Sequence, residues 1–161
     1  MAKEKEKPGE TLIVRNRRAR FEYELGETFE AGVVLMGSEI KMLRQGKADL
    51  GDSWCAVEQG EAWLKGVNVP ILTGAAFGHE AKRARKLLLH RNEIEQIERA
   101  LTRDGMTVAA TRLYFKDGRV KVEIALAKGK KEYDKRQTLR EKQDRRETDR
   151  AVSAARRRQR A

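Results

Sequence analysis

The most specific chemistry in this sequence lies in a run of basic residues near its N-terminus. Residues 15–23, RNRRARFEY, place four arginines and one asparagine beside two aromatic side chains. An arginine offers forked donors to phosphate oxygens and a flat face to an unpaired base, and an asparagine amide can read a base edge. The segment is therefore expected to bind RNA through the side chains of Asn16, Arg17, Arg18, Arg20 and Tyr23.

A second basic cluster lies in the middle of the chain. Residues 82–91, KRARKLLLHR, carry four lysines and arginines before three consecutive leucines. Arg85 and Lys86 are the candidate RNA contacts in this cluster. A run of charge is also the usual composition of a solvated surface, so neither cluster alone separates RNA binding from a plain exposed face. Two such clusters on a strongly basic chain favour RNA binding.

Catalytic and metal-binding patterns are weak by comparison. The only histidines, His79 and His90, have no cysteine between them, so no zinc site is expected. His79 and Glu80 would suit the base of a nuclease and its partner, but no third catalytic group is spaced around them. A polar surface pair or an RNA contact is the simpler interpretation. We expect no enzyme activity and no cofactor, and we expect Cys55 to be a buried structural thiol.

The excess positive charge is concentrated at the C-terminal end. Residues 128–161 hold 14 Lys and Arg against 6 Asp and Glu, a net charge of +8, which leaves +3 of the chain's +11 for residues 1–127. This excess indicates a phosphate-rich partner, because each neutralised phosphate releases condensed counterions. A membrane surface fits poorly, since Leu139 and Val152 are the tail's only large apolar residues. The charged first residues, the absence of an apolar run of about 18 residues and the single cysteine predict a cytoplasmic protein.

Hydrophobic periodicity predicts the elements that must position these side chains. Residues 20–36 indicate one long bent strand or two consecutive ones. The further expected elements are a helix over residues 38–46 with Ser38 as its N-cap, a strand pair joined at Gln59-Gly60, a helix over residues 91–105, and a hairpin whose turn is Asp117-Gly118.

The order of these elements predicts the fold class. Short strands with two or three intervening helices, and no strand–helix–strand rhythm, argue against a parallel sheet. The expected fold is mainly β, a small antiparallel barrel of the oligonucleotide-binding type with two or three flanking helices and a basic C-terminal tail. The expected parts are a flexible N-terminus over residues 1–11, an RNA-binding barrel over residues 12–128 and the tail over residues 129–161.

Several blocks of the sequence resemble one protein family. NRRARFEY, ETFEAG, RKLLLH, LYFKDGRVKVEIALAKGKK and YDKR occur in this order, with compatible gaps, in the small protein B family, the SsrA-binding proteins of bacterial trans-translation. The resemblance covers residues 16–136 almost without interruption. The chain departs from the family where Glu80-Ala81 replaces a usual Asp-Pro, so a less rigid loop is expected. Phe21 also stands where histidine is common.

The resemblance implies an adaptor and not an enzyme. Proteins of this family bind the tRNA-like part of transfer-messenger RNA, which carries alanine and arrives with elongation factor Tu and GTP at ribosomes stalled on messages that lack a stop codon. The family's protein occupies the place of the missing codon–anticodon interaction. We expect a monomer with no membrane partner. For this chain the resemblance implies that the RNA-gripping residues are Asn16, Glu30, Leu88 and Lys121.

Two of these residues leave alternatives open. Phosphate repels the carboxylate of Glu30, so Glu30 either accepts a hydrogen bond from a base amino group or orients a neighbouring basic side chain without touching RNA. Leu88 is either a core residue or an exposed side chain that packs against an unstacked base.

The resemblance also implies a role for the tail at the decoding site of the small ribosomal subunit and in the empty message channel. The residues expected to act there are Lys130, Lys131, Tyr133, Asp134, Lys135, Arg136, Arg140 and Arg145, with Tyr133 stacked on a ribosomal base. A capping box predicts that a helix begins near Thr138. Like charges and the lack of an apolar stripe predict that this helix is disordered alone and folds on the ribosome. The alternative is a merely solvated basic tail.

Other function classes stay open at this point. A generic RNA chaperone or a ribosomal protein would bind any structured RNA, and a nuclease would consume its substrate. An adaptor should prefer transfer-messenger RNA and should be required for tagging of the stalled peptide.

Overall fold

The computed structural model describes residues 8–71, 79–129 and 132–160. Within these residues, strands and helices alternate irregularly along the chain. The strands are β1 (Glu10–Arg15), β2 (Tyr23–Val33), β3 (Trp54–Glu58), β4 (Glu61–Lys65), β5 (Arg85–Leu88), β6 (Thr107–Lys116) and β7 (Arg119–Gly129). The helices are α1 (Arg17–Glu22), α2 (Gly37–Arg44), α3 (Arg91–Thr102) and α4 (Glu132–Arg160).

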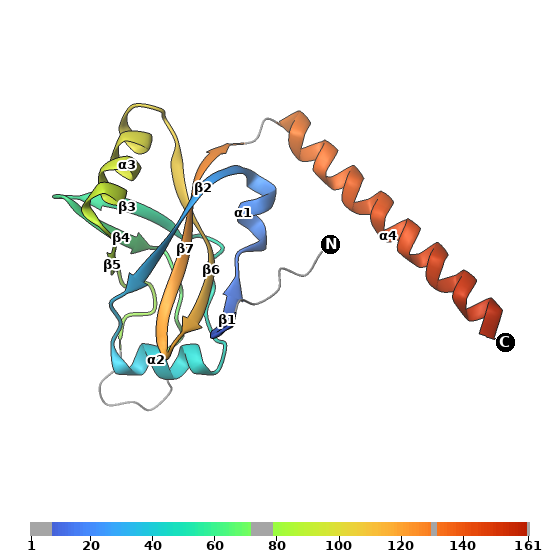
Figure 1. Ribbon diagram of the computed structural model, residues 1–161, viewed down its shortest axis with the longest axis horizontal. Coiled ribbons are helices and arrows are strands. Elements are labelled where there is room, and N and C mark those ends of the chain that lie inside the picture. The colour runs from blue at the N-terminus through green and yellow to red at the C-terminus, as the bar shows by residue number, and fades with distance from the viewer. Residues whose placement is uncertain (1–7, 72–78, 130–131, 161) are drawn as a thin grey trace. The chain divides into compact units, whose positions relative to one another are not determined.

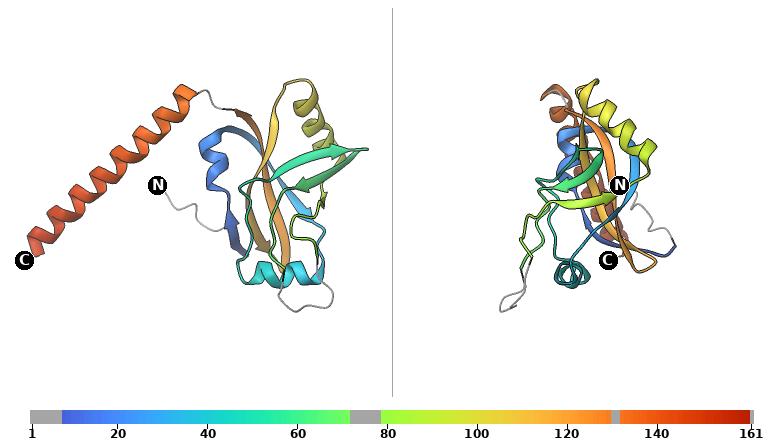
Figure 2. Two further views of the ribbon diagram at one scale, coloured as in Figure 1. Left: turned by 180° about the vertical axis from the view of Figure 1, so that it is seen from behind. Right: turned by 90° about the vertical axis from the view of Figure 1, so that its left-hand side faces the viewer.

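The strands form one curled sheet in the order β1-β6-β7-β2-β5-β4-β3. The registered pairs β1/β6, β6/β7, β2/β5, β4/β5 and β3/β4 are all antiparallel. The short β3–β4 hairpin crosses the long strands β6 and β7 steeply (Figure 2), and β3 packs against β6. Within the described residues no hydrogen-bonded ladder joins β3 to β6, so the barrel is open at this seam. The predicted mainly β, antiparallel, barrel-like fold is confirmed.

Aliphatic side chains fill the interior of the curled sheet. The long strands β6 and β7 contribute Val108, Leu113, Val122 and Ile124 to this core. Helices α2 and α3 lie at opposite ends of the sheet (Figure 1), and they add Met42 and Ile97. Cys55 is buried as predicted, and its burial raises the pKa of the thiol to about 12, so the thiol stays protonated at neutral pH.

The β6–β7 hairpin forms where the sequence predicts it, because its turn residues tolerate left-handed backbone. The φ angle is +51° at Asp117 and +78° at Gly118, as a type I′ turn requires. The turn fixes the register of the two strands, in which Tyr114 lies opposite Lys121. The helix expected near residues 91–105 and the strand pair joined at residues 59–60 are also present.

The first arginine cluster is helical, which the sequence analysis did not predict. The strand expected to start at residue 20 begins only at Tyr23, because residues 17–22 form α1. The side chain of Asn16 caps this helix by accepting a hydrogen bond from the Ala19 N–H (3.1 Å). Strand β1 also starts earlier than the expected barrel boundary, at Glu10.

Helix α2 has a different N-cap from the expected one. It begins at Gly37 with Met36 as its N-cap residue, because the Glu39 carboxylate accepts a hydrogen bond from the Met36 N–H (2.9 Å). The Ser38 hydroxyl, expected to cap the helix, instead bonds Nδ1 of His79 (2.9 Å).

Residues 129–161 form a compact unit of their own. Helix α4 spans Glu132–Arg160 in this unit, so the predicted helix start near Thr138 was too late. The side chains that are described along α4 are all exposed. A helix without a buried face has only local interactions to stabilise it, and its disorder in the free protein stays a prediction. No helix among the described residues is both long enough and apolar enough to cross a membrane.

Candidate RNA-binding surface

Three of the residues expected to grip RNA meet on one face of the sheet. Glu30 comes from β2, Leu88 from β5 and Lys121 from β7, and these strands are neighbours. Leu88 lies opposite Gly32 in the β2–β5 register and is 58 % exposed, so it is not a core residue. A Cβ atom added to Gly32 would lie 3.3 Å from the Leu88 Cβ and 3.6 Å from the Lys121 Nζ. Both side chains therefore lie close over this glycine.

The Glu30 carboxylate is held by residues from another strand. The Tyr114 hydroxyl donates to Oε2 (2.5 Å), and Lys116 Nζ lies 3.1 Å from Oε1 and 3.3 Å from Oε2. Burial raises the pKa of Glu30, but these hydrogen bonds and the charges of Lys116 and Lys121 outweigh it, and the pKa lies below its ordinary value. The carboxylate is therefore ionised at neutral pH, and its remaining lone pairs can accept a further donor.

Sequence reasoning missed half of this group of residues. We call the group the sheet patch; its members are Glu30, Gly32, Leu88, Tyr114, Lys116 and Lys121. Gly32 leaves room for the side chains of Leu88 and Lys121. The signal for Tyr114 was present in the hairpin, because a turn at residues 117–118 places Tyr114 opposite Lys121.

The first arginine cluster presents a basic surface on α1, a helix that packs against β2 and β6. Arg17, Arg18 and Arg20 are exposed, as RNA contacts must be. Arg18 also pairs with Glu22 (2.8 Å) and Asp52 (3.1 Å). Tyr23 is half-buried and packs against a small cluster of buried alanines.

Asn16 lies inside the protein. Its side chain is 4 % exposed, and Nδ2 donates to the carbonyls of Leu50 (3.0 Å) and Ala110 (2.8 Å), while Oδ1 accepts from Ala19. One amide thus ties together α1, β6 and the segment before β3. The structure assigns Asn16 to this internal junction, where it offers no free group to RNA.

The Asn16→Ala variant is expected to lose about 2–3 kcal/mol of unfolding free energy, because a helix cap disappears and two buried carbonyls lose a donor. Thermal unfolding followed by circular dichroism measures the loss. Arg17→Ala, a change at the neighbouring exposed residue, is the control and should leave the melting temperature unchanged. An Asn16→Ala chain with the stability of the control would show that the amide does not hold this junction.

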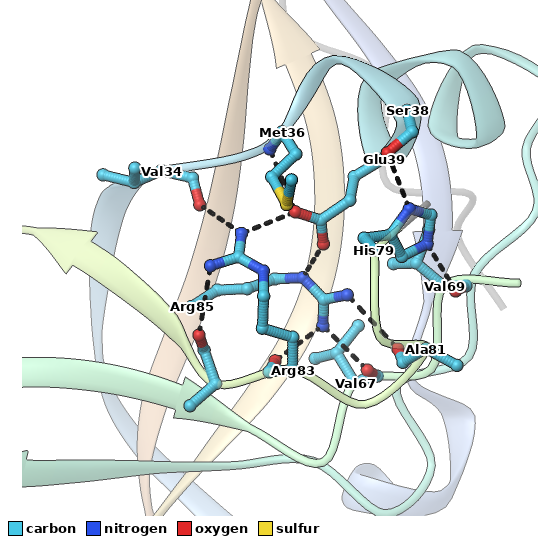
Figure 3. A network of polar contacts seen from close by, with 11 residues as sticks. Val34, Met36, Ser38, Glu39, Val67, Val69, His79, Ala81, Arg83 and Arg85 are labelled. Carbon is cyan, nitrogen blue, oxygen red and sulfur yellow. Dashed lines mark hydrogen bonds and ion pairs between the residues drawn. The ribbon is translucent and has the colours of Figure 1, made fainter. Parts of the chain in front are cut away.

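The second basic cluster is divided between the interior and the surface. Arg85 is 1 % exposed, and it pairs with the fully buried Glu39 of α2 and donates from Nη1 to the Val67 carbonyl (2.9 Å) (Figure 3). The expectation that Arg85 contacts RNA is therefore corrected to an internal role. Lys86 remains half-exposed and pairs with Glu61 (3.1 Å) on the adjacent strand.

His79 belongs to the same internal network as Arg85. The ring is 4 % exposed, with Nδ1 at Ser38 and Nε2 at the Val69 carbonyl (2.9 Å), so the surface position expected for it was wrong (Figure 3). The Ala81 carbonyl accepts hydrogen bonds from Arg85 (3.2 Å) and from the Val69 N–H (2.9 Å). In the described parts of the chain, no group of His, Cys, Asp and Glu could hold a metal ion.

Comparison with known proteins identifies the family. A family model described as SmpB protein matches residues 13–154. The chain belongs to the SmpB family. It is 63 % identical over 147 residues to an SsrA-binding protein of Sorangium cellulosum, covering 91 % of each chain. It is 56 % identical over 162 residues to an SsrA-binding protein of Streptomyces coelicolor, covering all of both.

A solved structure supports the same family. It is described as "tmRNA-SmpB: a journey to the center of the bacterial ribosome", and one of its chains is similar to the present chain with a TM-score of 0.64 and 40 % sequence identity. The similarity covers 74 % of this chain and 85 % of that one.

The tail residues are only partly described. Arg136, Arg140 and Arg145 lie on α4 and are exposed. Residues 133–135 also lie on α4, but the structure does not describe their side chains. Lys130 and Lys131 lie outside the described residues. The expected contacts of these residues with the ribosome stay predictions.

Proposed function

We propose that this chain is an RNA-binding adaptor that grips the tRNA-like part of transfer-messenger RNA and brings it to stalled ribosomes. The observation that carries the proposal is the sheet patch, where an ionised acceptor, an exposed apolar side chain and a lysine meet on an oligonucleotide-binding-type barrel. Family membership supports the RNA partner, since the relatives are named SsrA-binding protein. The ribosome is supported by the solved tmRNA-SmpB structure.

The patch residues provide complementary contacts to an RNA loop. Lys121 is suited to a phosphate, and the exposed Leu88 to the apolar face of an unstacked base. Glu30 accepts a hydrogen bond from a base amino group, and at the same time it holds Lys116. The arginines of α1 add phosphate contacts that depend on salt concentration.

The remaining parts of the proposal concern the ribosome. Elongation factor Tu with GTP reaches the chain through the RNA, and the protein acts as a monomer in the cytoplasm without catalysing a reaction. Tyr133 stacks at the decoding site, where Lys130, Lys131, Asp134 and Lys135 lie nearby, and α4 occupies the empty message channel. Twenty-nine residues of helix extend about 44 Å at ~1.5 Å per residue, a length that suits a channel.

The Lys121→Glu variant is expected to weaken binding to transfer-messenger RNA by about 1–3 kcal/mol, because a charge-assisted contact is replaced by repulsion of phosphate. A filter-binding or fluorescence titration at fixed salt measures the change. Lys41→Glu, the same substitution at an exposed position on α2, is the control and should bind nearly as the wild type does. Equal affinities of the two variants would remove Lys121 from the interface.

The same titration tests the function as a whole. The wild type should bind transfer-messenger RNA more tightly than an unrelated structured RNA of equal length, and it should be required for peptide tagging in a reconstituted translation system. Equal affinity for both RNAs would indicate a generic RNA chaperone. Shortened RNA after incubation would indicate a nuclease.

A further inference from the structure

The position of the Glu30 carboxylate is set from outside its own strand. Its side chain is 38 % exposed, yet Oε2 accepts a hydrogen bond from the hydroxyl of Tyr114, a residue that is 1 % exposed. A buried donor that bonds an exposed acceptor fixes the direction in which the acceptor's remaining lone pairs point. Lys116 bonds both oxygens of the same carboxylate, but its own side chain is 40 % exposed and is therefore the less rigid of the two partners.

Tyr114 is itself fixed by a charged framework. The Arg112 guanidinium lies over the Tyr114 ring, 4.3 Å from its centroid. Arg112 is held in turn by Glu10 of β1 (3.2 Å) and by Glu123 of β7 (2.8 Å). A cation over the ring face is attracted to the π electrons, so this contact helps to hold the ring in place. Strands β1, β6 and β7 thus all contribute to the position of a carboxylate on β2.

A phenylalanine could replace the packing of the Tyr114 ring, but it could not replace the hydrogen bond of the hydroxyl. Tyr114 is one of the largest fully buried side chains, and a phenylalanine would fill the same space except for the hydroxyl. A buried hydroxyl needs a hydrogen-bond partner, and here the partner is an ionised group that reaches solvent in the middle of the sheet patch. The arrangement is suited to presenting a fixed acceptor to a ligand.

We propose that Tyr114 is a positioning residue for RNA recognition: its hydroxyl orients Glu30 so that the carboxylate accepts a hydrogen bond from an exocyclic base amino group. The inference rests on the proposed function and extends it, because it names the residue that sets the acceptor's geometry. The bases that carry such an amino group are adenine, cytosine and guanine, whereas uracil carries none.

A double-mutant cycle tests this role. Tyr114→Phe keeps the ring beneath Arg112 and removes only the hydroxyl, and Glu30→Gln removes the charged acceptor. In the wild-type background, Tyr114→Phe is expected to weaken binding to transfer-messenger RNA about tenfold, as loss of a hydrogen bond to a charged group does. In the Glu30→Gln background the same change should have less than about a twofold effect, because there is no carboxylate left to orient.

The pH dependence of binding gives a second measurement that a purely structural role would not change. The charged and titratable groups that face Glu30 are Tyr114 and Lys116 from β6 and Lys121 from β7. Removal of the hydroxyl removes a hydrogen bond that lowers the pKa of Glu30, so the pKa rises. On acidification the Tyr114→Phe variant should therefore lose affinity at a higher pH than the wild type. The Glu30→Gln chain corrects for protonation of RNA bases.

The outcomes separate this inference from the proposed function. If the wild type does not prefer transfer-messenger RNA, both are wrong. If the wild type does prefer transfer-messenger RNA, any of three results overturns only the role of Tyr114. These are an unchanged affinity of Tyr114→Phe, an equal loss of affinity in both backgrounds, and a Glu30→Gln chain that binds like the wild type. If Tyr114→Phe melts below the assay temperature, Lys116→Met takes its place in the cycle, since Lys116 is half-exposed and bonds the same carboxylate. A loss that does not depend on Glu30 then contradicts positioning through this carboxylate.

Discussion

Replacing Glu39 with alanine is expected to lower the free energy of unfolding by about 3–5 kcal/mol. Glu39 is fully buried, and its carboxylate accepts hydrogen bonds from Arg83, Arg85 and the Met36 N–H. Alanine would leave the buried guanidinium of Arg85 without its opposite charge and away from water. Urea unfolding followed by tryptophan fluorescence measures the effect.

A matched control is available in the adjacent loop. Glu80 is exposed, so Glu80→Ala removes the same charge without opening the interior, and its unfolding midpoint should stay at the wild-type value. If Glu39→Ala proved as stable as Glu80→Ala, the buried ion pair would not be holding α2 to β5. The Glu39→Ala variant should bind RNA more weakly only under conditions in which it unfolds, because the Glu39 side chain is fully buried and cannot contact a ligand.

The pKa of Glu39 allows a prediction of how the free energy of unfolding depends on pH. Burial raises the pKa of Glu39, but the hydrogen bonds from Met36, Arg83 and Arg85 outweigh it, and the folded-state pKa lies below the ordinary value. Such a group stabilises the fold above its unfolded-state pKa, and this contribution is lost as the pH falls through the folded-state pKa. The wild type should therefore lose stability on acidification below the ordinary range of a glutamate, and Glu39→Ala should lose less over the same interval.

Proline at position 141 is expected to abolish peptide tagging while RNA binding stays unchanged. Glu141 lies inside α4, where proline removes a backbone donor and costs about 3 kcal/mol or more of helix stability. If α4 acts in the empty message channel, as proposed, this break prevents the helix from filling it. A reconstituted translation system programmed with a message that lacks a stop codon measures transfer of alanine to the stalled peptide.

The controls for this experiment separate helix formation from charge and from RNA binding. Glu141→Ala removes the same carboxylate but keeps the helix, so it should support tagging. A chain that ends at Lys128 should retain its preference for transfer-messenger RNA, because the sheet patch lies before that residue. Tagging at the normal rate by Glu141→Pro would leave α4 as a nonspecific electrostatic anchor.

Local signals and family resemblance were sufficient for part of this protein. The Asp117-Gly118 turn can be predicted because only a few residue types adopt two successive positive φ angles, and α3 because its apolar residues recur at helical spacing. These signals depend on residues that are close together in the sequence, so a short segment is enough to predict them. The resemblance of several blocks to the small protein B family added the identity of the family and named Glu30, Leu88 and Lys121 as candidates. The structure brings these three residues together on neighbouring strands.

The tertiary structure decided which polar side chains face water. The sequence predicted the same role for Arg85 as for the exposed arginines of α1, yet Arg85 is buried because Glu39, 46 positions away in the sequence, supplies a carboxylate inside the protein. Asn16 was expected to read RNA, but its amide bonds the carbonyls of Leu50 and Ala110, which only the folded sheet brings to it. The framework of Tyr114 likewise spans strands that are far apart in the chain. A charged or amide side chain looks the same in the sequence whether it faces water or is buried with a hydrogen-bond partner. The buried case requires a partner, and that partner comes from a residue distant in the sequence.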